Sequence, residues 1–183
     1  MSSAPRHPLP GRLVWVVAVG VAGIIAVLDQ ATKVLAVEFL SDQSIDWGLV
    51  AFRLVRNPNA AFGIPGFPGM FLLVTVIVAV LIGRLLYTTD RLWLAFAYGL
   101  VLGGAVGNAL DRVFRPPGFP EGAVVDFVAV GRFPVFNVAD SGITVGAVLL
   151  IVLLLRRDQE KAREEAAHPD QKAVRPDTSS PRR

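Results

Sequence analysis

Four long apolar stretches constrain the fold of this chain more than any other feature of its sequence. A helix needs roughly 20 residues to cross about 30 Å of hydrocarbon. The stretches that meet this requirement lie near residues 13–36, 68–87, 92–110 and 136–155. The chain is 53% hydrophobic and only 18% charged, which is too apolar for an ordinary soluble domain of 183 residues. The sequence therefore predicts an all-α membrane protein with four transmembrane helices.

The first apolar stretch follows a short basic start and could be mistaken for a signal peptide. It continues through Asp29 and Lys33 without a clean small-x-small cleavage site, so we expect a retained helix. The second and third stretches are joined by the short link TTDR, which predicts an antiparallel hairpin. An even number of spans places both termini on one side of the membrane.

The basic residues predict which side that is. Two Lys or Arg precede the first span, two flank the hairpin link and eight follow the last span, against five on the opposite side. Because cytoplasmic segments carry an excess of Lys and Arg, we expect both termini in the cytoplasm. The tail, residues 156–183, mixes charges with Pro and Ser and has no apolar face. We expect it to be frayed helix passing into disorder, without a catalytic role.

Two loops, residues 37–67 and 111–135, then lie outside the cytoplasm. The first contains LVAFRLV and predicts a small strand-containing platform on the membrane surface. The second contains FRPPGFPEG, and we expect it to be irregular because its prolines prevent a continuous helix. Neither loop is long enough for an independent domain, so residues 1–155 should form a single membrane-embedded domain.

The composition limits the chemistry that is open to this chain. It has no Cys, and its two His, at positions 7 and 168, lie in polar terminal segments. A thiol nucleophile, a thiolate metal site and a His-based triad are therefore excluded from the body of the chain. Catalysis would fall to carboxylates, Lys or Ser/Thr, and we expect neither a metal nor a cofactor. The basic residues form no amphipathic surface, so we expect no nucleic acid partner.

Several ionisable residues interrupt the apolar helices, where each costs about 2.5 to 3.5 kcal/mol near the bilayer centre. Asp29 and Lys33 are spaced i, i+4 and can neutralise one another on one helix face. Asn108 and Asp111, at i, i+3, lie beside Arg112 at the outer end of the third span. Both groups could be structural ion pairs or parts of an interfacial site, and the sequence leaves this open.

Two further acids occur where the chain returns to the outer membrane face. Asp126 lies in AVVDFV, whose valines would bury its carboxyl and raise its pKa, and Asp140 lies in FNVADSGI, where it could also be a helix cap. They are fourteen residues apart, which is enough for the chain to return and for the two acids to meet. Two adjacent carboxyl groups cannot both ionise cheaply, so one can hold a proton while the other activates water, as in aspartic proteases. Asp111 is the main rival for one of the two positions.

Five motifs occur in one order along the four predicted spans. They are DQATK at 29–33, RNPNAAFG at 56–63, GGAVGNALDR at 103–112, VVDF at 124–127 and FNVADSGI at 136–143. In this order and topology the chain resembles the bacterial lipoprotein signal peptidases, or signal peptidase II, over most of residues 13–155. It departs from them at Asn59, where the family usually has Gly, and in the short stretch between Asp126 and Asp140. Asn tolerates a left-handed backbone, so the turn should survive.

The resemblance implies that Asp126 and Asp140 are the catalytic dyad of a membrane aspartyl endopeptidase. The residues that would support or line the site are Asp29, Lys33, Asn57, Asn108, Asp111, Arg112, Asn137 and Ala139. Such an enzyme removes the signal peptide from diacylglyceryl-modified prolipoproteins, cleaving just before the lipidated cysteine. The implied partners are that prolipoprotein and membrane lipid. We expect a monomer in the bacterial cytoplasmic membrane, with its active site at the outer face.

Two other functions use similar residues. A small transporter or proton-coupled channel also needs intramembrane Asp, Lys and Asn, but its polar groups should extend through the midplane toward both faces. Here they collect at one edge, and the stretch from Ile143 to Leu155 carries no charge. A scaffold in which all the acids form structural ion pairs would tolerate Asp126→Asn combined with Asp140→Asn, whereas a peptidase would not.

Overall fold

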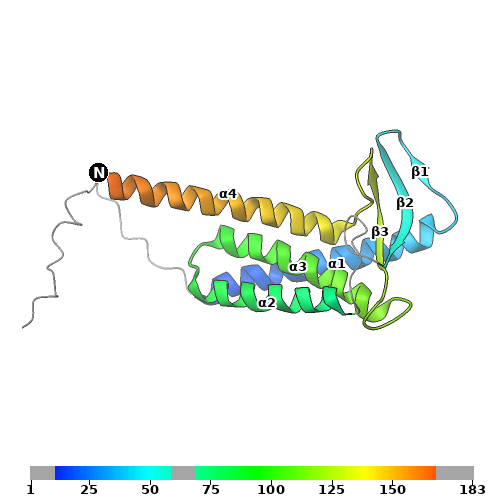
Figure 1. Ribbon diagram of the computed structural model, residues 1–183, viewed down its shortest axis with the longest axis horizontal. Helices are drawn as coiled ribbons and strands as arrows, with labels where there is room; N and C mark the ends of the chain where they lie inside the picture. The colour runs from blue at the N-terminus through cyan, green and yellow to red at the C-terminus, as the bar shows by residue number, and fades with distance from the viewer. Residues whose placement is uncertain (1–10, 59–68, 168–183) are drawn as a thin grey trace, which may run out of the picture. The chain divides into compact units, whose positions relative to one another are not determined.

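The structure is a computed structural model that describes residues 11–58 and 69–167. Within this part of the chain there are four long helices: α1 (Gly11–Leu40), α2 (Met70–Thr88), α3 (Leu92–Phe114) and α4 (Val138–Ala167) (Figure 1). Each contains a stretch that is long and apolar enough to cross a membrane. The predicted fold class, a four-span helical membrane protein, is confirmed.

Three of the helices are longer than the sequence predicted. α1 continues to Leu40, α3 to Phe114 and α4 to Ala167. The extension of α4 makes residues 156–167, the first part of the tail, helical; residues 168–183 lie outside the described part. These residues, RRDQEKAREEAA, are mostly strong helix formers, which explains why the helix does not end with the apolar stretch. The chain forms two compact units, Met1–Leu150 and Ile151–Arg183. The sheet and all residues of the site described below belong to the first unit.

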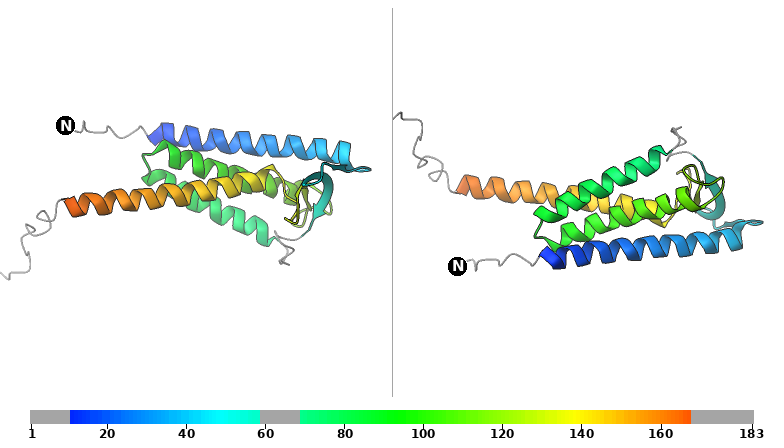
Figure 2. Two further views of the ribbon diagram at one scale, coloured as in Figure 1. Left: turned by 90° about the horizontal axis from the view of Figure 1, so that it is seen from above. Right: turned by 90° about the horizontal axis from the view of Figure 1, so that it is seen from below.

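Glycines on α3 allow its neighbours to approach closely. A Cβ on Gly103 would lie 2.6 Å from the Ala22 carbonyl oxygen on α1, and one on Gly104 would overlap the Ala139 carbonyl at the start of α4. Because only glycine fits at such crossings, α3 packs backbone to backbone against both helices. Figure 2 shows α3 running beside α1 and α2. α3 is also the span with the largest buried share.

A small antiparallel sheet lies where α1 and α3 end and α4 begins (Figure 1). Its strand order is β1 (Ile45–Asp46), β2 (Val50–Asn57) and β3 (Val124–Val130). The predicted strand-containing platform in the first loop is therefore confirmed. The expectation that the whole second loop is irregular is wrong for β3, because no proline occurs between Pro120 and Pro134 and the apolar run VVDFVAV is free to pair.

Packing against α1 holds the sheet in place. Val125 and Phe127 of β3 form a buried hydrophobic cluster with Ala36 and Leu40 near the end of α1. Pairing with β2 sets Asp126 opposite Val55. The sheet thereby places Asp126 above the ends of the helices, beside the polar residues that they carry.

Candidate active site

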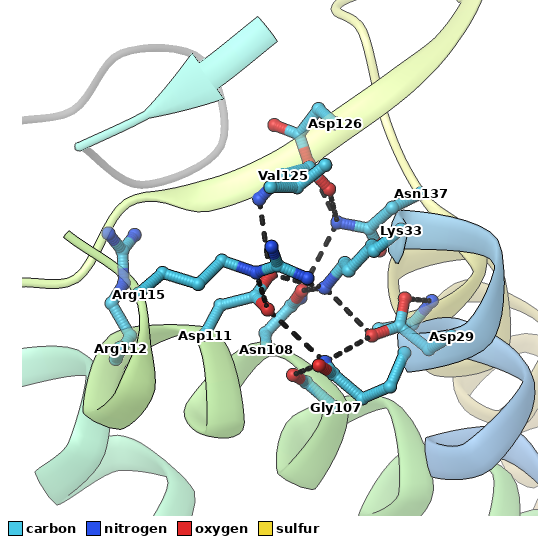
Figure 3. Close-up of polar contacts among 12 residues, drawn as sticks. Asp29, Lys33, Gly107, Asn108, Asp111, Arg112, Arg115, Val125, Asp126 and Asn137 are labelled. Atoms are coloured by element: carbon cyan, nitrogen blue, oxygen red, sulfur yellow. Dashed lines mark hydrogen bonds and ion pairs between the residues drawn. The ribbon is translucent and has the colours of Figure 1, made fainter. Parts of the chain in front are cut away.

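Lys33 is at the centre of a cluster of ion pairs, the ion cluster, which we define as Asp29, Lys33, Asp111 and Arg115 (Figure 3). Its Nζ lies 2.7 Å from Asp29 Oδ2 and 2.8 Å from Asp111 Oδ2, and it donates to Asn108 Oδ1 at 3.0 Å. Lys33, Asp29 and Asp111 have no exposed surface. The i, i+4 pair predicted between Asp29 and Lys33 is present, and Asp111 joins it from α3.

Asp111 ties three elements together. Its Oδ1 accepts from Arg115 Nε at 2.6 Å and from Gln30 Nε2 at 3.2 Å, and its Oδ2 accepts the Val125 backbone N–H at 3.1 Å. One carboxylate thus connects α1, α3 and β3. Sequence reasoning missed Gln30 and Arg115. The i, i+4 spacing of Arg115 from Asp111 could have indicated the pair, and Gln30 lies within the DQATK motif.

Asp29 also caps the fourth helix. Its Oδ1 accepts the backbone N–H of Ala139 at 2.9 Å, which satisfies one of the free donors at the start of α4. A Cβ on Gly107 would lie 2.7 Å from Asp29 Oδ2, so glycine is needed for this approach. Ala139 itself is fully buried. Ala139 therefore contributes to the site through its backbone N–H, which donates to Asp29.

Asp140 and Asn137 form a reciprocal cap at the start of α4. Asn137 Oδ1 accepts the Asp140 N–H at 2.9 Å, and Asp140 Oδ2 accepts the Asn137 N–H at 3.2 Å. This is a capping box in which Asp replaces the usual Glu or Gln. Asp140 therefore does act in a helix cap, as the sequence allowed. Its second oxygen has a different partner.

Asp126 and Asp140, which we call the carboxyl pair, are connected through amide side chains. Asn137 Nδ2 donates to Asp126 Oδ1 at 2.6 Å and to Asn108 Oδ1 at 3.1 Å. Asn108 Nδ2 in turn donates to Asp140 Oδ1 at 2.8 Å. Asn57 Nδ2 donates to the other oxygen of Asp126 at 3.2 Å. Each acid is thus held by two hydrogen bonds from asparagine.

Both members of the carboxyl pair line one cavity of about 650 Å³. Its walls come from α2, α3, α4 and the end of the sheet, and they include Phe71, Thr75, Asn108, Arg112, Phe133 and Val145. In the described part of the chain, the residues that line this cavity include Asp126 and Asp140 but not Asp111. The rival acid is instead enclosed by cations. Most of the lining is apolar, as is usual for ligand-binding cavities.

Burial perturbs Asp126, which is only 3% exposed. Loss of solvation, followed by the negative charge of Asp140, raises the pKa of Asp126 to about 6. The hydrogen bonds from Asn57 and Asn137 oppose this rise without cancelling it. A carboxyl group with such a pKa can exchange a proton near neutral pH, which is the property that acid–base catalysis requires.

Arg112 supports the rim of the cavity. One guanidinium nitrogen donates to the carbonyl oxygens of Gly122 at 2.9 Å and Asn57 at 3.1 Å. The guanidinium carbon also lies 4.6 Å from the ring centroid of Phe71. Arg112 therefore joins the end of β2 to the segment before β3 while part of it faces the cavity.

All ten site residues predicted from the sequence lie at one end of the helices, in the described part of the chain. Asn59, where the chain departs from the family pattern, lies outside that part. Among the described residues, no three His, Cys, Asp or Glu side chains are grouped so that they could hold a metal ion. The fold and this site define a multi-pass membrane protein with paired carboxyl groups in a cavity at one end of its spans.

Known proteins identify the family more closely. The family model described as signal peptidase (SPase) II matches residues 21–156. The chain is 46% identical over 157 residues to a lipoprotein signal peptidase of Rhodococcus jostii, covering 84% of this chain and 79% of that protein. It is 44% identical over 140 residues to the lipoprotein signal peptidase of Mycobacterium leprae, covering 73% and 68%.

A solved structure shows the same fold. A bacterial membrane enzyme determined by the in meso method superimposes with a TM-score of 0.69 at 30% identity, covering 79% of this chain and 90% of that one. The chain therefore belongs to the signal peptidase II family, which is a family of proteases. It is a multi-pass bacterial membrane protein, and the resemblance seen in its motifs is confirmed.

Proposed function

We propose that this chain is a membrane aspartyl endopeptidase that removes signal peptides from prolipoproteins whose lipobox cysteine carries diacylglycerol, cleaving just before that cysteine. The observation that carries the proposal is the carboxyl pair. Asp126 and Asp140 line the same cavity, and each is held by asparagine N–H groups. Membership of the signal peptidase II family supports the same reaction.

In the proposed mechanism a water molecule between the two carboxyl groups attacks the scissile carbonyl carbon. The ionised carboxylate takes a proton from this water, and the protonated carboxyl stabilises the developing oxyanion. The tetrahedral intermediate then collapses, the C–N bond breaks, and the leaving amine of the cysteine takes up a proton from the pair. The pair finishes with one proton, as it began, and no covalent intermediate forms.

The remaining polar residues would bind substrate or hold the pair in place. Arg112 and Asn57 line the cavity beside Asp126 and could hydrogen-bond to the substrate main chain. Phe71, Thr75 and Val145, which come from the membrane-spanning helices α2 and α4, line another part of the cavity. The acyl chains can stay in the bilayer while the peptide reaches the carboxyl groups at the interface. The charges of the ion cluster are already paired with one another, so we propose that the cluster holds the helices and β3 in place rather than binding substrate.

The orientation is part of the proposal. The excess of basic residues at the termini and the hairpin link supports cytoplasmic termini and an active site at the outer membrane face. In this orientation the cleavage site of the prolipoprotein must reach the outer membrane face. We also propose that the protein acts as a monomer, because both carboxyl groups and their asparagine partners come from one chain.

The experiment that tests this function is direct. The purified protein in detergent is incubated with a diacylglyceryl-modified prolipoprotein, and cleavage is followed by a gel mobility shift. Wild type should cleave, whereas Asp126→Asn and Asp140→Asn should not, and Asp111→Asn should keep residual activity at matched folded amounts. The same prolipoprotein without its lipid should stay intact. Failure of the wild type to cleave would overturn the proposal, and an inactive Asp111→Asn beside an active Asp126→Asn would move the site.

A further inference from the structure

Lys33 uses every hydrogen-bond donor it has. Its ammonium carries three N–H groups, and its three contacts are Asp29 Oδ2, Asp111 Oδ2 and Asn108 Oδ1. The first two contacts balance charge. The third reaches a neutral amide, and charge balance gives no reason for it.

That third contact decides which way the Asn108 amide points. An ammonium only donates, so the Asn108 atom that faces Lys33 at 3.0 Å must be the oxygen. The same oxygen accepts from Asn137 Nδ2 at 3.1 Å. The amide nitrogen therefore faces Asp140, to which it donates at 2.8 Å. If the amide were flipped, its nitrogen would meet two donors and its oxygen would face a carboxylate.

Asp140 is thereby set up as an acceptor on both oxygens. Oδ1 accepts from Asn108 and Oδ2 from the Asn137 backbone N–H, and neither group can accept a proton in return. Asp140 also lies in the first turn of α4, where the helix N-terminus favours negative charge. Hydrogen bonds donated to a carboxylate favour its ionised form.

Asp126 has a different environment. It also accepts two asparagine N–H groups, but it lies on a strand rather than at a helix N-terminus, and only 3% of it is exposed. Its burial raises its pKa to about 6, which favours holding the shared proton. We propose that Lys33 is a positioning residue that acts through the Asn108 amide to hold both oxygens of Asp140 as acceptors, so that Asp140 is the base and Asp126 the acid. This inference rests on the proposed peptidase function and deepens it.

Other charges around Asp140 must be considered in any test by pH. The charged groups of the ion cluster and of the cavity linings are Asp29 and Lys33 on α1, Asp111 and Arg112 on α3, Arg115 just after it, Arg56 on β2 and Asp126 on β3. Of these, Lys33 contacts the amide that binds Asp140, whereas Arg115 contacts Asp111. Arg115 is therefore a matched control, because removing it takes one cation from Asp111 without touching Asn108.

The test is the pH profile of kcat/KM for cleavage of the lipid-modified prolipoprotein. Asn108→Ala leaves both ion pairs of Lys33 in place but removes the donor to Asp140. We expect its acid limb to move to higher pH by about one unit, the shift that corresponds to one hydrogen bond to a charged group. Lys33→Met should move the acid limb in the same direction, and adding it to Asn108→Ala should move it no further. Arg115→Met should leave the limb where it is.

Lys33→Met leaves two buried acids short of a cation and can fail to fold. In that case Asp29→Asn combined with Lys33→Met keeps the buried charge balanced, and Asp29→Asn alone is its control. The combined variant should shift the limb and the control should not. An unshifted limb in Asn108→Ala, or equal shifts in the Lys33 variants and their controls, would overturn the inference while leaving the peptidase function standing. Absence of cleavage by wild type would instead overturn the function itself.

Discussion

The ion cluster and the carboxyl pair are neighbours joined by Asn108, but they treat carboxylates in opposite ways. Asp29 and Asp111 are fully buried and lie within 2.8 Å of Lys33. Asp126 and Asp140 line a cavity and are held by asparagine N–H groups. A neighbouring cation compensates the charge of a carboxylate, whereas a neutral amide donates a hydrogen bond without adding a compensating charge. Similar residues therefore provide structure in one region and acid–base chemistry in the other.

The largest effect should come from removing the titratable oxygen of the carboxyl pair. Asp126→Asn and Asp140→Asn should each lower the cleavage rate by about 10³-fold or more, because an amide cannot exchange the proton that the reaction moves. The measurement is the rate per folded protein in detergent. Asp42→Asn, a change at an exposed position in the first loop, is the matched control. Retention of a tenth of the activity in either variant would remove that acid from the pair.

The same substitution in the ion cluster should act on stability instead. Asp111→Asn breaks contacts with Lys33 and Arg115 that are buried, and breaking such a pair costs about 3–5 kcal/mol. Denaturant unfolding in detergent should show this loss, while the remaining folded protein keeps measurable activity. If Asp111→Asn were as stable as wild type but inactive, Asp111 would take part in catalysis like the carboxyl pair. The proposed division between a structural and a catalytic region would then be wrong.

The pH dependence of stability tests whether Asp126 differs from the carboxylates of the ion cluster. The pKa of Asp126 is raised by burial from 3.8 to about 6, so the folded state binds its proton more tightly than the unfolded state does. Asp126 thus stabilises the fold fully below about pH 4 and loses this contribution as pH rises through 6. At pH 8 the loss corresponds to about 3 kcal/mol.

Asp126→Asn removes this penalty. Its stability relative to wild type should therefore be greatest at pH 8 and should decrease as the pH falls from 6 to 4, as measured by unfolding across that range. Asp42→Asn should show no such slope. A difference that stays constant with pH would mean that burial does not perturb Asp126.

The smallest effect should come from the edge of the ion cluster. The Arg115 side chain is 19% exposed, unlike its fully buried partner Asp111. Because solvent screens such a pair, Arg115→Met should cost only about 1 kcal/mol of stability and leave the cleavage rate unchanged. The measurement is thermal unfolding of Arg115→Met, Lys33→Met and wild type under the same conditions. An Arg115→Met variant as unstable as Lys33→Met would mean that the two cations are equivalent.

The sequence by itself determined the four spans and the hairpin between the second and third, and it predicted ten residues that the structure brings to one end of the helices. Apolar length sets the spans because the bilayer requires it, and local spacing already paired Asp29 with Lys33. The helix ends were less accurate. α4 extends beyond its apolar part because the residues that follow are good helix formers. β3 was not predicted because its partner β2 lies far away in the sequence.

Only the tertiary structure decided how the acids divide between the two regions. From the sequence, Asp111, Asp126 and Asp140 were all candidates at the outer face, since each lies near the end of a span or in an outer loop. The close crossings of α3 with α1 and α4 enclose Asp111 with Lys33, and strand pairing carries Asp126 to the cavity that Asp140 lines. Whether a carboxyl meets a cation or an amide depends on contacts between distant segments, and local sequence patterns do not encode them.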